Sequence, residues 1–102
     1  MGWHAVASVD DVSGEEALPV SAAGKAIALV SFDGRIRALD DVCTHEFAVL
    51  SDGVVEDGCI ECPLHQARFR LDSGKRESGP QCADLRVYET KVENGTVYVR
   101  TD

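Results

Sequence analysis

The sequence predicts an all-β fold, because short apolar runs alternate with turn signals along the chain. Residues 26–32 form an apolar run that is followed by Asp33-Gly34 and by a second run over residues 35–39. An Asp-Gly pair between two such runs is a strong signal for a β-hairpin. No window shows a sustained repeat of 3.6 residues, so we expect antiparallel sheets and no long helix.

The same hairpin pattern recurs at the end of the chain. Residues 85–92 alternate apolar and polar side chains, Asn94-Gly95 predicts a turn, and residues 96–100 return as a second strand. Between the hairpins, Gly, Asp and Pro divide residues 40–82 into short pieces. The turn signals there are Asp52-Gly53, Asp57-Gly58, Ser73-Gly74 and Gly79-Pro80. The one helical segment that we expect is a single turn near residues 47–50.

Length and charge limit the possible functions. The chain has 102 residues, of which 44% are hydrophobic, and a net charge of −8. This composition suits one domain with a modest core, and the negative charge argues against nucleic acid and anionic membranes as partners. We find neither the pattern of a secretory signal nor an apolar run near the roughly 18 residues that span a bilayer. We therefore expect a cytoplasmic protein, in which metal binding explains the presence of four cysteines better than two disulfides do.

Two short motifs contain the residue types that bind metals. Cys43-Thr44-His45 and Cys62-Pro63-Leu64-His65 each combine one thiolate with one imidazole, and sixteen residues separate His45 from Cys62. A zinc finger instead places its two Cys in one motif, C-x2-4-C, and its two His in another, H-x3-5-H. A mononuclear zinc site in a binding module nevertheless remains one possible interpretation of these four residues.

The pairing of C-x-H with C-x2-H resembles the signature of Rieske-type [2Fe–2S] proteins, in which two Cys bind one iron and two His bind the other. The resemblance implies one [2Fe–2S] cluster held by Cys43, His45, Cys62 and His65. It extends in order and spacing over about residues 3–100, through Leu50-Ser51-Asp52-Gly53, Gln66-Ala67-Arg68-Phe69, Ser73-Gly74, Pro80, Leu85-x-x-Tyr88 and Val97-Tyr98-Val99. It implies a single Rieske domain over residues 1–102, built of antiparallel β-sheets with a cluster-binding subdomain inserted at about residues 41–83.

Three departures from the cytochrome bc-type members of that family bear on the reduction potential. Ala48 and Leu64 stand where those proteins have the two Cys of a loop disulfide, and Ala67 stands where they have a Ser hydroxyl. Two neutral His ligands raise the potential above that of an all-Cys ferredoxin. Without the disulfide and the hydroxyl donor, we expect a potential toward the lower end of the range of roughly −150 to +300 mV.

The two other cysteines have simpler interpretations. Cys59 and Cys62 form a C-x2-C pair, but a thioredoxin-like motif needs a helix N-terminus within a βαβ unit. We interpret Cys59 as a half-buried strand residue and Cys82 as a small apolar residue with a free thiol. A disulfide between Cys59 and Cys82 is the less favoured alternative.

The resemblance is closest to the small ferredoxins of bacterial ring-hydroxylating oxygenase systems. It implies a monomeric one-electron carrier, not an enzyme, that takes electrons from a flavin-dependent reductase using NADH or NADPH and delivers them to a terminal oxygenase. The alternative from the same family is a small subunit of a nitrite-reductase-like enzyme. Residues 38–67 contain seven acids and no Lys or Arg. They suggest either solvated loops or an acidic docking face for a basic partner.

Overall fold

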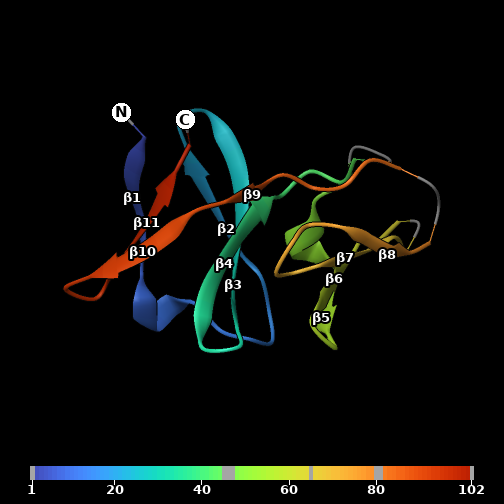
Figure 1. Cartoon of the computed structure of the whole chain (residues 1–102), viewed down its shortest axis with the longest axis horizontal. Helices are drawn as coiled ribbons and strands as arrows, with labels where there is room; N and C mark the ends of the chain where they lie inside the picture. Colours follow the sequence, from blue (N-terminus) through green and yellow to red (C-terminus); the bar gives the residue numbers. More distant parts are fainter. Residues whose placement is uncertain (1, 45–47, 65, 80–81, 102) are drawn as a thin grey trace.

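The computed structural model describes residues 2–44, 48–64, 66–79 and 82–101. Within these ranges the chain forms three antiparallel β-sheets (Figure 1). The terminal sheet, in the order β1-β11-β10, contains β1 (Trp3–Ser8), β10 (Thr90–Glu93) and β11 (Thr96–Arg100). The central sheet, in the order β2-β3-β4-β9, contains β2 (Leu18–Ala22), β3 (Lys25–Phe32), β4 (Arg35–Asp40) and β9 (Val87–Tyr88). The inserted sheet contains β5 (Val54–Glu56), β6 (Cys59–Glu61), β7 (Arg68–Arg70) and β8 (Arg76–Ser78) in sequence order.

The first predicted hairpin is confirmed. Strands β3 and β4 pair in register from Ile27 opposite Asp40 to Phe32 opposite Arg35. Asp33 and Gly34 have φ angles of 55° and 76°, which are the left-handed values that a type I′ turn requires at both central residues. The local Asp-Gly signal therefore determined both the turn and the register.

Strand β3 is buried on both faces, and this places the central sheet between two apolar cores. Ile27 and Leu29 pack with Val97 and Val99 of the terminal sheet. The opposite face of β3 packs into a second cluster, because successive strand residues point to opposite faces. We call this second cluster the site core; its buried members are Ala17, Ala28, Val30, Leu39, Cys43, Ala48, Leu50, Ile60, Cys62, Ala67, Phe69, Leu71 and Leu85.

The second predicted hairpin is only partly correct. The expected strand over residues 85–92 is divided into β9, which pairs with β4, and β10, which pairs with β11. The chain leaves the central sheet at Glu89, whose carbonyl accepts a hydrogen bond from the Arg100 N–H at 3.0 Å. The Tyr88 hydroxyl donates to Asp40, and burial followed by this bond raises the pKa of Tyr88 to about 12. Apolar and polar side chains alternate in the same way in β9 and β10. This alternation therefore does not show that the chain passes from one sheet to another.

The helical content also differs in detail from the prediction. The turn expected near residues 47–50 is a 3-10 helix, η2, at Leu50–Asp52, and a further 3-10 helix, η1, occupies Val9–Asp11. Phe47 lies outside the described residues. Over the described ranges, no helix has the length and apolar character to cross a membrane.

Candidate metal centre

The first motif lies in a loop that leaves β4 and is fixed by a buried carboxylate. Asp41 is 3% exposed and accepts hydrogen bonds from the Ser51 N–H at 2.7 Å and the Ser51 hydroxyl at 2.8 Å. Burial raises the pKa of Asp41, although both Ser51 bonds favour the charged form. The Cys43 N–H donates to the Ala48 carbonyl at 2.9 Å. The loop that carries Cys43 is thus held at both ends before any metal binds.

The second motif follows β6 directly and returns into β7. The Cys62 N–H donates to the Ala67 carbonyl at 2.8 Å, and the Gln66 N–H donates to the Cys62 carbonyl at 3.0 Å. Gln66 has a φ angle of 60°, a left-handed value that is uncommon for a residue other than glycine. These two bonds close a tight loop with Cys62 at its base.

Two further residues, Gly79 and Ala83, contact the motif loops. Thr44 Oγ1 donates a hydrogen bond to the Ala83 carbonyl. Gly79 lies so close to the second loop that a Cβ atom there would be 2.6 Å from Ala67 Cα. A side chain at position 79 would therefore displace the loop that carries Cys62.

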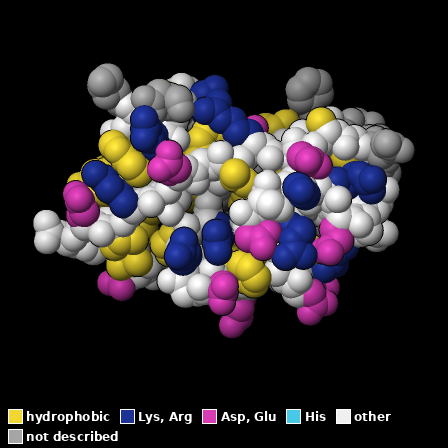
Figure 2. All heavy atoms as spheres, viewed as in Figure 1, with side chains coloured by type: hydrophobic (Ala, Val, Ile, Leu, Met, Phe, Trp, Pro, Cys, Tyr) yellow, Lys and Arg dark blue, Asp and Glu magenta, His cyan; other side chains and the backbone are white. Residues whose placement is uncertain are grey.

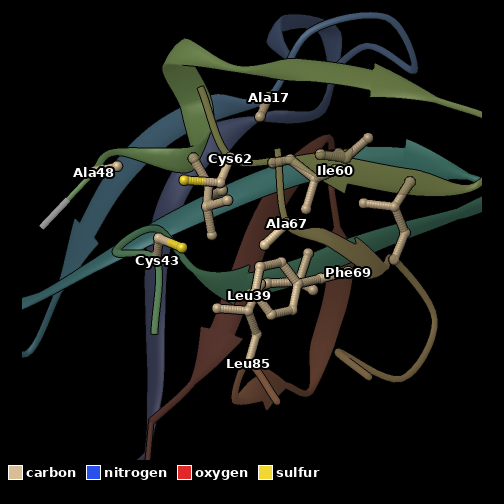
Figure 3. Packing of buried hydrophobic residues seen from close by; sticks show 13 residues of the cluster. Ala17, Leu39, Cys43, Ala48, Ile60, Cys62, Ala67, Phe69 and Leu85 are labelled. Carbon is tan, nitrogen blue, oxygen red and sulfur yellow. The ribbon is translucent and has the colours of Figure 1, made fainter. Parts of the chain in front are cut away.

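The thiols of Cys43 and Cys62 come together in the site core. Cys43 is 4% exposed and Cys62 is fully buried. Figure 3 shows both sulfur atoms at the same end of the core, each from its own loop, with Leu39, Phe69 and Leu85 beyond them. Two soft thiolates in a dry apolar setting fit the iron that a Rieske site binds through two Cys.

The other half of the predicted ligand set, His45 and His65, lies outside the described residues. Within the described ranges, no group of three or more His, Cys, Asp or Glu side chains suited to a metal gathers. Assignment of the four ligands Cys43, His45, Cys62 and His65 therefore stays a proposal.

Cys59 faces away from the site core. It is a strand residue, as predicted, but at 2% exposure it is fully rather than half buried. Its thiol donates to Glu77 Oε2 at 2.9 Å, and burial followed by this bond raises the pKa of Cys59. Cys82 packs at the margin of the site core, and both Cys59 and Cys82 are free thiols, so no disulfide joins them.

We expect a variant with Ser at both Cys59 and Cys82 to keep the visible spectrum of the wild-type protein. Cys59 lies outside the core that holds Cys43 and Cys62, and its bond to Glu77 suits a hydroxyl as well as a thiol. Absorption spectra and iron content of the purified variant test this. Loss of the chromophore in Cys59→Ser alone would show that the ligands are assigned wrongly.

The acidic stretch is not a uniform set of solvated charges. Asp41 is buried, and Asp40 accepts the Tyr88 hydroxyl. Arg68 Nη1 lies 2.9 Å from Glu61 Oε1 and 3.7 Å from Glu56 Oε1, while its Nη2 donates to the Glu56 carbonyl at 3.0 Å. Arg68 thereby joins β5, β6 and β7, and it partly neutralises the charge that the docking hypothesis invokes. Glu46, the acid within the first motif loop, lies outside the described residues.

Several residues that shape the site have no signal in the motifs. Gly53 is one: a Cβ atom there would lie 1.8 Å from the Glu61 carbonyl oxygen, directly before Cys62. The Asp41–Ser51 pair and the Gly79 contact are others. Each depends on a contact between segments that are well separated in the sequence. Asp52-Gly53 predicts a turn, but it does not predict the close approach of Gly53 to β6.

Comparisons with known proteins agree with this geometry. The Rieske [2Fe-2S] domain family matches residues 2–89, so the chain belongs to the Rieske family and binds a Rieske-type [2Fe–2S] cluster. The ferredoxin component of the naphthalene 1,2-dioxygenase/salicylate 5-hydroxylase systems of a Ralstonia species is 40% identical over 100 residues, which are 98% of this chain and 96% of that protein. The class is therefore the Rieske ferredoxins, which are electron-transfer components rather than catalytic subunits.

Solved structures support the same class. A ferredoxin of Sphingomonas yanoikuyae B1 superposes with a TM-score of 0.91 at 28% identity, over 97% of this chain and 98% of that one. A second similar chain comes from the structure of a complex of reduced oxygenase and oxidized ferredoxin in carbazole 1,9a-dioxygenase. It superposes with a TM-score of 0.87 at 33% identity, over 96% of this chain and 92% of that one. The all-β Rieske fold predicted from the sequence is confirmed.

Proposed function

We propose that this chain carries single electrons from a flavin-dependent, NAD(P)H-oxidising reductase to a terminal ring-hydroxylating oxygenase. The observation that carries the proposal is the convergence of Cys43 and Cys62, buried and from separate loops, at one end of the site core. The relatives that are ferredoxin components of dioxygenase systems support the choice of partners. We further propose that the protein acts as a monomer in the cytoplasm.

The cluster, when bound, supplies a centre that accepts and releases one electron. The residues of the chain hold it and control its surroundings. Cys43 and Cys62 supply two thiolates, and we propose that His45 and His65 supply the two imidazoles. The site core excludes water from the thiolates, and the exclusion of solvent affects the potential. Asp41, Ser51 and Gly79 keep the two loops in place, so little rearrangement accompanies a change of charge.

Exposed apolar side chains on both motif loops support transient docking there. Leu64 is 61% exposed, and Val42 and Val49, which face each other across an isolated bridge in the first loop, are 41% and 43% exposed. Weak redox complexes bury less than about 1,200 Å² in total, so such a contact needs only a small surface. We propose these side chains as the contact for both redox partners.

Metal and sulfide analysis tests the cofactor and its role together. We expect about two irons and two acid-labile sulfides per chain, and a rhombic EPR signal after reduction. In stopped-flow mixing, the reductase with NADH should bleach the visible absorption, and oxidised terminal oxygenase should restore it. Stoichiometric zinc without sulfide would contradict the cofactor. A reduced protein that no oxygenase component reoxidises would contradict the proposed partner while leaving the cofactor intact.

A further inference from the structure

An open groove lies away from the motif loops. Its volume is about 730 Å³, and it lies between β4, β9, β10 and the turn after β7. The residues that matter for its chemistry are Arg35, Arg37, Asp72, Val87, Lys91 and Val92. The chain carries a net charge of −8, yet Lys and Arg side chains spread across the face shown in Figure 2.

Three of the charged residues that line this groove are already paired. Asp72 lies 3.0 Å from Arg70, and Glu89 lies 3.6 Å from Arg100. Lys91 lies 3.6 Å from Glu93, and its ammonium also covers the ring of Trp3 at 4.6 Å. Each of these partners lies outside the groove lining. Arg35 and Arg37 of β4 are therefore the charged lining residues that are left without an ion-pair partner among the described residues.

Within the described part of the chain, neither Arg35 nor Arg37 has a carboxylate within ion-pair distance. Arg37 Nε is buried and has no hydrogen-bond partner there. The Arg37 guanidinium carbon also lies 6.0 Å from the centre of the Phe32 ring, a contact that neutralises no charge. The N–H groups at the end of the Arg37 side chain therefore remain to donate charge-assisted hydrogen bonds to an anion in the groove. The groove thus contains two positively charged side chains that lack an anionic partner in the part of the chain that the structure describes.

The spacing of the two arginines indicates the shape of the anion. Residues 35 and 37 lie two positions apart on one strand, so they share a face and are about 6.7 Å apart along it. Strand β9 pairs with β4 at Ala38 and Leu39, which leaves the Arg35–Arg37 half of β4 beyond the reach of β9. An extended segment with carboxylates at alternate positions has the same repeat. Val87 and Val92, 42% and 45% exposed, supply apolar contacts that a small inorganic anion would leave uncovered.

We propose that this groove binds an extended acidic segment of a partner protein, with alternate carboxylates on Arg35 and Arg37 and an apolar side chain against Val87 or Val92. None of its lining residues belongs to the two motif loops. The partner would then be held at a second surface while the cluster end of the molecule makes its own redox contact. A ferredoxin with an overall negative charge could in this way hold a partner segment that its bulk charge repels.

The test uses the cluster-containing protein and a synthetic peptide, acetyl-Glu-Val-Glu-Val-Glu-amide, with binding followed by NMR shifts and calorimetry. The double variant Arg35→Gln/Arg37→Gln should bind the peptide at least about tenfold more weakly, because two charge-assisted contacts are lost. Replacement of the peptide's Glu by Gln should weaken binding to the wild type equally. Lys25→Gln is the matched control, because Lys25 is exposed in β3 and lies outside the groove, and it should bind as the wild type does.

Unchanged peptide affinity in the double variant would overturn the proposal. Inorganic phosphate that reproduces all peptide shifts with equal affinity would overturn it in favour of a small-anion site. Self-association of the wild type that the double variant loses would overturn it in favour of a second copy of this chain. If the double variant does not fold, the peptide affinity of the single variant Arg35→Gln is the test, because Arg35 is exposed. This variant should bind the peptide about threefold more weakly than the wild type. Unaltered metal content and EPR of the variants keep this result separate from the electron-carrier proposal.

Discussion

Alanine in place of Gly53 is expected to lower the free energy of unfolding by more than about 3 kcal/mol and to reduce cluster retention. The added Cβ atom would lie 1.8 Å from the Glu61 carbonyl oxygen, 3.1 Å from the Glu61 carbonyl carbon and 3.2 Å from the Leu50 carbonyl oxygen. All three are backbone atoms, so no side-chain rotation relieves the clash. Relief requires η2 to separate from β6, and that movement displaces the start of the loop that carries Cys62.

Urea denaturation and iron content of the purified variant measure these two effects. Gly24→Ala is the matched control, because Gly24 has a φ angle of 77° but no atom within 4 Å of an added Cβ. Its cost should be limited to the left-handed backbone, about 1–2 kcal/mol, with full cluster content. Equal losses in the two variants would show that the close approach of Gly53 to β6 contributes nothing.

The parts of the fold that were predictable from the sequence are those that neighbouring residues determine. Asp33-Gly34 and Asn94-Gly95 form turns between paired strands because their own backbone preferences suit left-handed φ angles. The division of residues 85–92 between two sheets depends instead on the partners of each strand, which are β4 and β11. Those partners lie elsewhere in the chain, and local alternation carries no information about them.

The same distinction applies to the site. The two motifs and their resemblance to the Rieske signature predicted a shared site for Cys43 and Cys62, and both residues lie in the site core, while their role as ligands stays a prediction. The interactions that hold the loops connect Asp41 with Ser51, Gly53 with Glu61 and Gly79 with Ala67. None of these pairs has a distinctive spacing, since each depends on the packing of the inserted sheet. The burial of Asp41 was also unpredictable, because a charged residue in an acidic loop is usually solvated.

Serine in place of Cys62 is expected to reduce the iron content to below about a tenth of the wild-type value and to bleach the visible absorption. The proposed ligand is a thiolate, and a serine hydroxyl is far less acidic and a harder donor, so it is a poor substitute for iron in a sulfide cluster. Cys62 is fully buried in the site core, so the hydroxyl would also be placed among apolar side chains. Because metal binding contributes to folding stability, the melting temperature should fall along with the iron content.

Cys59→Ser separates the loss of a ligand from the loss of a buried cysteine. The two cysteines are three residues apart, and both are almost inaccessible to solvent. Cys62 belongs to the site core with Cys43, whereas Cys59 bonds to Glu77 on the other face of the inserted sheet. If burial alone mattered, both serine variants would lose the cluster to a similar degree. We expect only Cys62→Ser to be colourless, and a coloured Cys62→Ser protein with full iron content would remove Cys62 from the ligand set.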